Sequence, residues 1–475
     1  MALCGTAQTV GINFEPQNKG VAKHFRQAFV GSDGQSVVFL QRMGLLGTTE
    51  DLASYDLQQH EQARVKFDNV RINNTSEVII REALVNGSTL DLLLSIRQDD
   101  GLHIYHERRD MATLQLIGER QLLAKIEGSK SDELFFFSAT SPDGKLVGMA
   151  MVRFSSVLDV TVRASLYNRQ MDEQYWTMTV PAHGFNEILV TNNGEVVLAG
   201  LNIKDRRGVV NMSVSDGEES EKYSFSYDAN GILQNSYLTR YADGRVLLVA
   251  AMQESSKVIM RVGTNIDCVD AVTFDTRTKQ VNVDRHRFTT AELCVMENKK
   301  GEKTGYNWMI YGNLAQVVAD DEGAFAVVDN RWTTYRKGSL VNGERRGMLV
   351  LRIDREGHFV WSHASRTYIN MKAAAQNWLD YRWVPTREGI MLAYTTNKKD
   401  VFAGPGQAVK GVKNFGTDAN LTVVNLNREG KATENHFSIG KQVLMDRAWP
   451  LQDGRWLVFV SNSSKGAFGK IEIEN

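Results

Sequence analysis

The segment EILVTNNGEVVLAG (187–200) joins two apolar strands through a tight turn that contains Gly194. Close variants return as RYADGRVLLVAA (240–251), VVADDEGAFAVV (317–328) and WPLQDGRWLVFV (449–460). Alternating apolar residues on both sides of such a turn predict a β-hairpin, because Gly, Asn and Asp tolerate the positive φ that tight hairpin turns need. One hairpin cannot bury both of its faces, so a chain that repeats it must stack the copies against each other.

The same turn signal occurs eight times along the chain. Its positions are Asp33-Gly34, Asn86-Gly87, Asp143-Gly144, Asn193-Gly194, Asp243-Gly244, Glu322-Gly323, Glu388-Gly389 and Asp453-Gly454. Successive glycines of this series lie 50 to 79 residues apart. Each interval has room for four strands of ordinary length with their loops. Sustained 3.6-residue periodicity is absent, which argues against an α-helical fold.

A second hairpin motif follows the first in several repeats. MLVLRIDREGHFVWSHA (348–364) and LTVVNLNREGKATENHF (421–437) are close copies, and YSFSYDANGILQNSY (223–237) and AVTFDTRTKQVNVDRHRF (271–288) are looser ones. Two hairpins per repeat make a four-stranded antiparallel sheet, and radial stacking of such sheets is a β-propeller. The repeats resemble those of large bacterial propeller proteins, which run strand, Asp-x-x-Gly turn and strand ending in Trp. That resemblance concerns the fold and carries no catalytic motif.

The two ends of the chain predict how the ring closes. The last repeat holds three strands, DRAWPLQ, RWLVFVS and AFGKIEIE, and lacks its outer strand. The N-terminal segment QTVGINF (8–14) alternates and can supply that strand, which would remove an open sheet edge. We therefore expect one domain, residues 8–475, with eight blades. Seven blades are the alternative, because the strands between residues 205 and 312 are hard to assign.

Residues 1–7 allow two interpretations. They are either an ordinary start or the remainder of a secretory signal peptide, with Gly5-Thr6-Ala7 as a small-residue cleavage site. The second interpretation places the protein outside the cytoplasm, in a periplasm, on an outer-membrane surface or secreted. A cytoplasmic location is the alternative.

Composition narrows the range of functions. The 475 residues are 42% hydrophobic and 23% charged with a net charge of −1, which disfavours nucleic acid as a partner of the whole protein. No apolar run approaches the ~20 residues that span a bilayer, which leaves association with a membrane-bound complex open. Three cysteines make neither a disulfide framework nor a metal site, and the spacing of His103 and His106 sends their imidazoles to opposite faces of a strand. We expect no metal and no cofactor.

Three irregular segments break the repeat on one face of the predicted disc. Residues 291–311, 331–347 and 396–420 are longer than a tight connection and read as loops of neighbouring blades. Their charges are 0, +4 and +2, so together they carry +6 on a chain whose net charge is −1. Arginines interleaved with aromatic residues suit planar, anionic or carbohydrate ligands and protein hot spots.

These segments supply the predicted partner-binding residues. They are Trp308, Arg331, Trp332, Tyr335, Arg336, Arg345, Arg346 and, at the entrance to the next inner strand, Trp378. The alternative interpretation is that the loops are simply solvated and that Trp332 or Trp378 packs between blades.

The favoured function is a non-catalytic binding or scaffold propeller that recognises a protein or glycan, an acidic partner in particular, through blades five to eight. The alternative is a glycan-active hydrolase or lyase, for which Asp380 and Asp446 near the central channel are the candidate catalytic carboxylates. Both residues also suit turns or hydrogen bonds between blades. A pair of channel carboxylates with a perturbed pKa would favour the enzyme.

Overall fold

The computed structural model describes most of the chain. The described residues are 10–14, 18–19, 28–43, 49–67, 78–129, 132–156, 159–180, 185, 187–204, 206–229, 231–253, 266–289, 292, 294–297, 303–306, 312–336, 339–365, 367–372, 381–386, 388–401, 408–412, 418–441, 444–451, 455–461 and 465–473. These residues contain no α-helix, and thus no helix long and apolar enough to cross a membrane.

Strand pairing in this part of the chain defines eight antiparallel sheets, which we number as blades 1 to 8. Blades 1 and 2 comprise β3 (Ala28–Ser32), β4 (Ser36–Met43), β5 (Thr49–Asp56) and β6 (Glu61–Lys66), then β7 (Val78–Asn86), β8 (Thr89–Gln98), β9 (Gly101–Asp110) and β10 (Gln121–Glu127). Blades 3 and 4 comprise β11 (Glu133–Thr140), β12 (Leu146–Ser156), β13 (Asp159–Asn168) and β14 (Gln174–Val180), then β15 (Glu187–Val190), β16 (Val196–Lys204), β17 (Arg207–Ser215) and β18 (Ser220–Asp228).

The second half of the chain continues in the same order. Blade 5 comprises β19 (Ile232–Arg240), β20 (Arg245–Gln253), β21 (Cys268–Asp275) and β22 (Val281–Arg287). Blade 6 comprises β25 (Gly312–Asp320), β26 (Gly323–Arg336), β27 (Ser339–Asp354) and β28 (Phe359–Ser365), with β29 (Ile369–Lys372) added to β27. Blade 7 comprises β30 (Arg382–Pro385), β31 (Gly389–Asn397), β33 (Asp418–Asn427) and β34 (Ala432–Lys441), and blade 8 comprises β35 (Leu444–Pro450), β36 (Trp456–Ser461), β37 (Lys465–Ile473) and β1 (Val10–Phe14), with β2 (Asn18–Lys19) also on β37.

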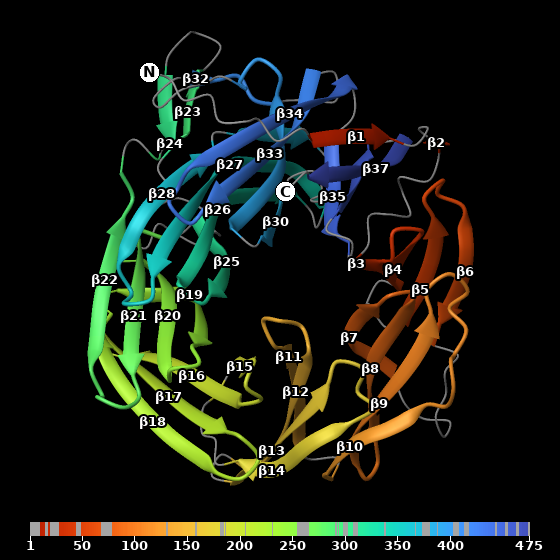
Figure 1. The fold of residues 1–475 in the computed structure, drawn as a ribbon, viewed down its shortest axis with the longest axis vertical. Coiled ribbons are helices and arrows are strands. Elements are labelled where there is room, and N and C mark those ends of the chain that lie inside the picture. The colour runs from red at the N-terminus through yellow and green to blue at the C-terminus, as the bar shows by residue number, and fades with distance from the viewer. Residues whose placement is uncertain are drawn as a thin grey trace.

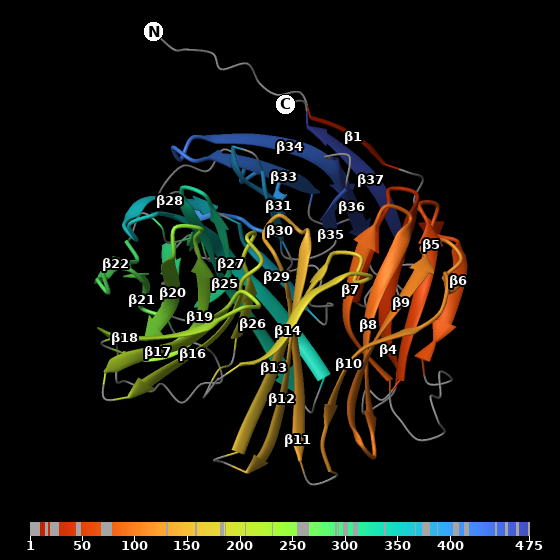
Figure 2. The same cartoon turned by 60° about the horizontal axis from the view of Figure 1, so that its bottom comes forward.

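The sheets stand in a ring around a central axis, so the protein is a β-propeller, as the repeats predict (Figure 1). The first strand of each blade lies at the centre and the fourth at the rim. Figure 2 shows the same ring tilted, with the blades side by side. The eight sheets match the blade count that the turn signals favour.

The predicted tight turns connect the first and second strands of the blades. Six of their glycines, at positions 34, 87, 144, 194, 244 and 323, have positive φ. At Gly323 a Cβ atom would stand 2.1 Å from the carbonyl oxygen of Ile353, so the strand pair requires glycine there. Gly454, in the last turn of the series, lies outside the described residues.

The core of the molecule lies between neighbouring blades rather than within one. The strands β8, β20 and β31 are buried along nearly their whole length, because a second strand is covered on both faces. The apolar clusters each draw on two adjacent sheets: Val197 and Met212 of blade 4 pack in one cluster with Val246 and Phe274 of blade 5. This packing explains why the strands read as apolar runs.

One predicted hairpin is wrong. Residues 223–237 end β18 of blade 4 and begin β19 of blade 5, so this segment links two sheets. The other three copies of the motif do join the third and fourth strands of blades 5, 6 and 7.

The N-terminal strand closes the ring as expected. β1 pairs with β37 over five residues, from Val10 opposite Ile473 to Phe14 opposite Gly469. Behind this pair, Phe459 and Phe468 of blade 8 share a buried cluster with Phe39 and other residues of blade 1. The first and last blades are thus joined by strand pairing and by packing. Residues 1–7, the predicted signal remnant, lie outside the described residues.

Deletion of residues 1–15 should destabilise the whole protein, because it leaves the outer edge of β37 without its partner strand. We expect the melting temperature to fall by about 5 °C or more and the protein to aggregate more readily. Deletion of residues 1–7 alone, which spares β1, is the matched control. A 1–15 deletion that melts with the parent and stays monomeric would contradict this role of β1.

Candidate functional site

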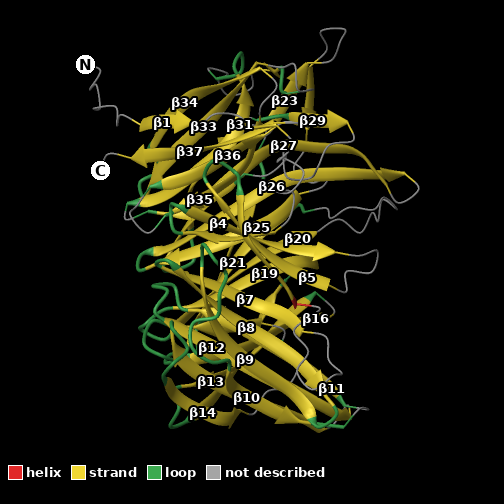
Figure 3. Ribbon diagram, turned by 90° about the vertical axis from the view of Figure 1, so that its right-hand side faces the viewer, coloured by secondary structure: helices red, strands yellow, loops and turns green. Residues whose placement is uncertain are grey.

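The strand order gives the disc two unlike faces. In each blade, the turn between the first and second strands and the turn between the third and fourth open on one face, which we call the turn face. The turn between the second and third strands and the link to the next blade open on the other, the connection face. Figure 3 shows short loops on one side of the disc and the long ends of β11, β26, β27 and β29 on the opposite side.

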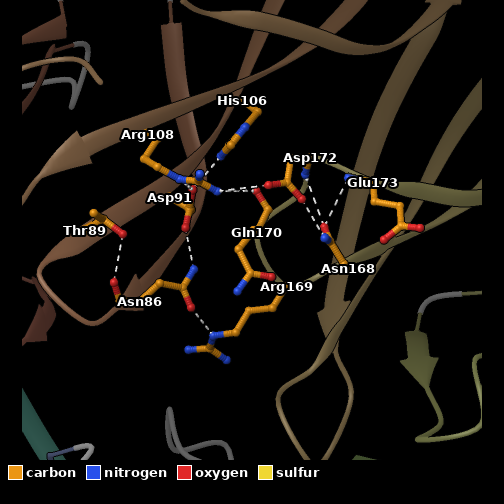
Figure 4. A network of polar contacts seen from close by, with 10 residues as sticks. All are labelled: Asn86, Thr89, Asp91, His106, Arg108, Asn168, Arg169, Gln170, Asp172 and Glu173. Carbon is orange, nitrogen blue, oxygen red and sulfur yellow. Dashed lines mark hydrogen bonds and ion pairs between the residues drawn. The ribbon is translucent and has the colours of Figure 1, made fainter. Parts of the chain in front are cut away.

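A buried carboxylate on the turn face organises a polar network that joins two blades. Asp91 of β8 has no exposed surface. Its carboxylate accepts hydrogen bonds from His106 Nε2 (2.7 Å), Arg108 Nε (2.9 Å) and Asn86 Nδ2, as Figure 4 shows. Burial opposes ionisation of this carboxyl, but the hydrogen bonds outweigh burial and lower the pKa of Asp91. Asp91 is therefore a fixed negative charge.

This network ties blade 2 to blade 3. Arg169, in the turn after β13, donates through Nη2 to the carbonyl oxygen of Val85 (2.8 Å) and through Nε to Asn86 Oδ1. In the other direction, Arg108 Nη2 donates to the carbonyl oxygen of Gln170 (3.0 Å). These contacts run in both directions between the two blades, so the cluster ties blade 2 to blade 3 on the turn face.

The same tie recurs around the turn face. Arg355 of blade 6 pairs with Asp243 of blade 5 (2.9 Å), and Arg428 of blade 7 pairs with Asp320 of blade 6 (3.3 Å). Like Arg169, each arginine directly follows the Asn or Asp that begins the turn between the third and fourth strands. Arginines of these short turns thus tie three blade boundaries on the turn face, two of them through ion pairs.

The connection face carries an ordered addition, which we call the annex. It consists of β23 (Cys294–Glu297), β24 (Lys303–Tyr306), β29, β32 (Ala408–Val409) and the outer ends of β26 and β27. β23 pairs in parallel with β32, β29 pairs with β27, and Ile369 of β29 bridges to Val412. The three irregular segments of the sequence therefore meet in one structure, although they are far apart along the chain; β23, β24 and β32 lie together in Figure 1.

The expectation that residues 331–347 form a loop is wrong. β26 and β27 continue as a paired hairpin from Arg331 opposite Arg345 to Arg336 opposite Ser339. Residues 291–311 and 396–420 likewise contain strands. Polar composition suggested loops, whereas pairing with segments distant in sequence stabilises strands here.

Buried polar contacts fix the annex. The carboxylate of Glu344 accepts hydrogen bonds from the hydroxyl of Tyr368 (2.5 Å) and from Asn370 Nδ2 (3.4 Å). Asp400 accepts the backbone N–H groups of Lys410 (2.8 Å) and Gly411 (2.6 Å). These carboxylates satisfy groups that the ends of irregular segments would otherwise leave open.

Of the predicted binding residues, only Arg345 has a described side chain, and it is buried. Arg345 is fully buried, with its guanidinium 5.8 Å from the ring centre of Tyr381. A buried guanidinium cannot belong to an exposed basic face, so Arg345 is removed from the predicted patch. Trp308 and Trp378 lie outside the described residues. For the other five residues the structure describes the backbone alone and places it in the annex hairpin: Arg331, Trp332, Tyr335, Arg336 and Arg346.

A second feature of the connection face is an apolar pocket on blade 3. It has a volume of about 310 Å³ and is lined by Glu133, Phe135, Phe137, Val152, Phe154 and Phe185. Phe135 and Phe154 are 43% and 36% exposed, which is unusual for phenylalanine. Figure 2 shows the β11–β12 hairpin that carries most of these residues extending on the lower side of the ring. Sequence reasoning missed this pocket, although three consecutive phenylalanines in ELFFFSAT (133–140) were a visible signal.

One carboxyl on the first strand of a blade has a perturbed pKa. Glu187, on the first strand of blade 4, accepts the backbone N–H of Leu238 on the first strand of blade 5 (3.2 Å). Burial raises the pKa of Glu187 to about 7, and this single hydrogen bond offsets burial only in part. Of the predicted carboxylates, Asp380 lies outside the described residues, and Asp446 is placed on the innermost strand β35 without a description of its side chain.

Metal-binding geometry is not found in the part of the chain that the structure describes, where no three His, Cys, Asp or Glu side chains converge. His103 and His106 bind different carboxylates, Asp100 and Asp91, as their spacing predicts. Glu82, on the first strand of blade 2, accepts a hydrogen bond from Ser138 Oγ of blade 3 (2.7 Å).

Comparison with known proteins adds little. No protein-family model matches the chain, and no curated protein matches it. Among solved structures, the chain is similar to a Synechocystis apocarotenoid oxygenase (12% identity, TM-score 0.37, 92% of this chain and 95% of that one) and to the polysaccharide lyase Uly1 (9%, 0.35, 97% and 100%). It is also similar to quinohemoprotein alcohol dehydrogenase from Comamonas testosteroni (8%, 0.32, 98% and 78%). Likenesses this distant carry no argument about function.

The pKa of Glu187 predicts a pH-dependent stability. Its folded pKa, about 7, lies above the usual 4.5, so ionisation opposes folding and stability falls as pH rises from about 4.5 to 7. Glu187→Gln keeps an acceptor for Leu238 and removes this penalty. Above pH 7 the variant should be more stable than the parent by up to about 3 kcal/mol, and below pH 4.5 the two should agree.

The measurement is urea unfolding at pH 4.5, 6 and 8. Glu133→Gln, which alters an exposed carboxylate of blade 3, serves as the control and should leave the pH profile of stability unchanged. If the free energy of unfolding of Glu187→Gln and of the parent changed with pH in parallel, burial would not penalise the charge of Glu187.

Proposed function

We propose that this propeller is a non-catalytic binding protein that holds a protein or glycan partner on its connection face. The observation that carries the proposal is the asymmetry of the disc. Short, ion-paired turns occupy the turn face, whereas the connection face bears the annex and the phenylalanine pocket. Binding residues concentrate on segments that a rigid scaffold holds, and an ordered addition outside the blades has no role in closing the ring.

Charge favours an acidic partner. The segments 331–347 and 396–420 carry +4 and +2 by sequence, on a chain of net charge −1. Arg345 contributes to the first figure although its side chain is buried. The remaining arginines of the hairpin, at positions 331, 336 and 346, are the basic groups that we assign to the partner-binding face.

We also propose an extracytoplasmic setting, which cell fractionation would test.

Replacing Arg331, Arg336 and Arg346 together with Ser should weaken binding to acidic polymers, because it removes three positive charges from one hairpin. The probes are heparin and poly-L-glutamate on a solid support, from which the variant should elute at lower salt than the parent. The matched control replaces three exposed basic residues of the turn face, Lys145, Arg277 and Lys431, with Ser. Equal elution of the two triple variants would contradict the assignment of the face.

A glycan-active hydrolase or lyase is the second candidate, and Glu187 is the observation in its favour. A carboxyl on an innermost strand whose pKa burial raises to about 7 has the protonation state that a general acid needs near neutral pH. Incubation with neutral and acidic polysaccharides tests this candidate: reducing or unsaturated ends that appear with the parent and vanish in Glu187→Gln would establish it. No product with any polysaccharide class would support binding alone.

A further inference from the structure

The pocket on blade 3 lies where the described first strands of neighbouring blades differ in length. β11 runs for eight residues, whereas β15, the first strand of blade 4, runs for four. Among the described residues, no first strand of blade 4 lies opposite the outer end of β11, and Phe185 of the link between the two blades packs there against Phe137. The aromatic rings of β11 and β12 are left facing a gap.

The opposite side of this gap is formed by β16, which presents few side chains there. Val196 and Leu198 of β16 pack against blade 3 in the same cluster as Val152. Because side chains alternate along a strand, the next residue of β16 on that side is Gly200, which presents no side chain. Among the described residues, the cluster between blades 3 and 4 includes Val152, Val196 and Leu198, and the 310 Å³ pocket lies beyond it towards the connection face.

Aromatic rings dominate the pocket. Phe135 and Phe154 meet edge to face with their centres 5.7 Å apart and their planes at 84°, and Phe137 and Phe185 meet at 5.4 Å and 63°. In an edge-to-face pair one ring keeps its negative face open to a third group. A cation within about 6 Å of such a face is attracted by the ring quadrupole.

Glu133 is the charged residue among those that line the pocket, and its side chain is exposed at the first position of β11. A purely apolar occupant would displace water from this carboxylate without replacing the lost hydrogen bonds, and this desolvation costs free energy. An occupant with an apolar stem and a cationic end suits both parts of the pocket. Lysine and arginine side chains have that form.

We propose that this pocket binds a lysine or arginine side chain of a partner protein. The stem would lie on Phe135 and Phe154, and the charged end would meet the carboxylate of Glu133. The assignment rests on the proposed binding function and narrows its partner to a protein, since a glycan without amino groups offers no such cation. A free amine is disfavoured because Phe135 and Phe154 are 43% and 36% exposed, so an occupant that covers the rim is needed to exclude water from them.

The probes are two fluorescent pentapeptides that differ at one position, Gly-Leu-Lys-Leu-Gly and the same peptide with norleucine in place of lysine. Norleucine keeps the stem and removes the charge. Fluorescence anisotropy with the full-length protein should give an affinity for the lysine peptide about three- to tenfold higher, as expected for a cation on aromatic rings beside a carboxylate.

Two variants locate the effect. Glu133→Gln should abolish the preference for lysine without loss of stability, because this side chain is exposed. Phe154→Ala should weaken binding of both peptides. The matched control is Glu173→Gln, an exposed carboxylate of the same blade on the turn face, which should bind as the parent does.

Equal affinity for the two peptides, a preference that survives in Glu133→Gln, or no binding of either peptide by the folded parent would each overturn the proposal. The melting temperature of every variant is measured alongside, and Glu133→Gln decides the question if Phe154→Ala unfolds. Elution of the arginine variants from heparin tests the basic annex and does not involve the pocket, so failure of the two proposals can be told apart.

Discussion

Closure of the ring by β1 and β37 is the constraint on which the rest of this structure depends. Each sheet buries both faces against its neighbours, so an open ring would expose one face of blade 1 and one of blade 8 to water together with an unpaired strand edge. The two blades meet through Phe39 on one side and Phe459 and Phe468 on the other, while the five-residue pair of β1 with β37 joins the ends of the chain. Every polar tie between blades, and the placing of both faces, presupposes this closed ring.

The two faces of the disc then follow from antiparallel order. Turns between adjacent strands on the turn face are short, and Arg169, Arg355 and Arg428 use them to reach the preceding blade. Connections on the other face must cross between strands or between blades, so they tolerate additions without disturbing the sheets. The annex adds a strand to β27 of blade 6. The phenylalanine pocket lies beside β11, whose described length exceeds that of β15.

Sequence predicted the parts of the fold that are local. The turn glycines, the hairpins on both sides of them and the strand at residues 8–14 were visible because turn chemistry and period-two alternation depend on neighbouring residues. The annex hairpin at residues 331–347 was not, since it pairs with β29 and Arg345 packs near Tyr381, and both partners are distant in sequence. For the same reason the sequence predicted Arg345 to be a surface charge, although it is fully buried. The raised pKa of Glu187 could not be predicted either, because it depends on burial beside Leu238 of blade 5.

The central claim is that partners bind the connection face and not the turn face. A photo-reactive amino acid placed in living cells at one residue of each face tests it most directly, with Phe135 and Lys399 replaced on the connection face and Lys145 and Arg277 on the turn face, all four exposed. We expect a covalent adduct of defined mass from one or both of the first two positions and none from the last two. Adducts formed from Lys145 or Arg277 alone would contradict the claim and place the partner on the ion-paired face.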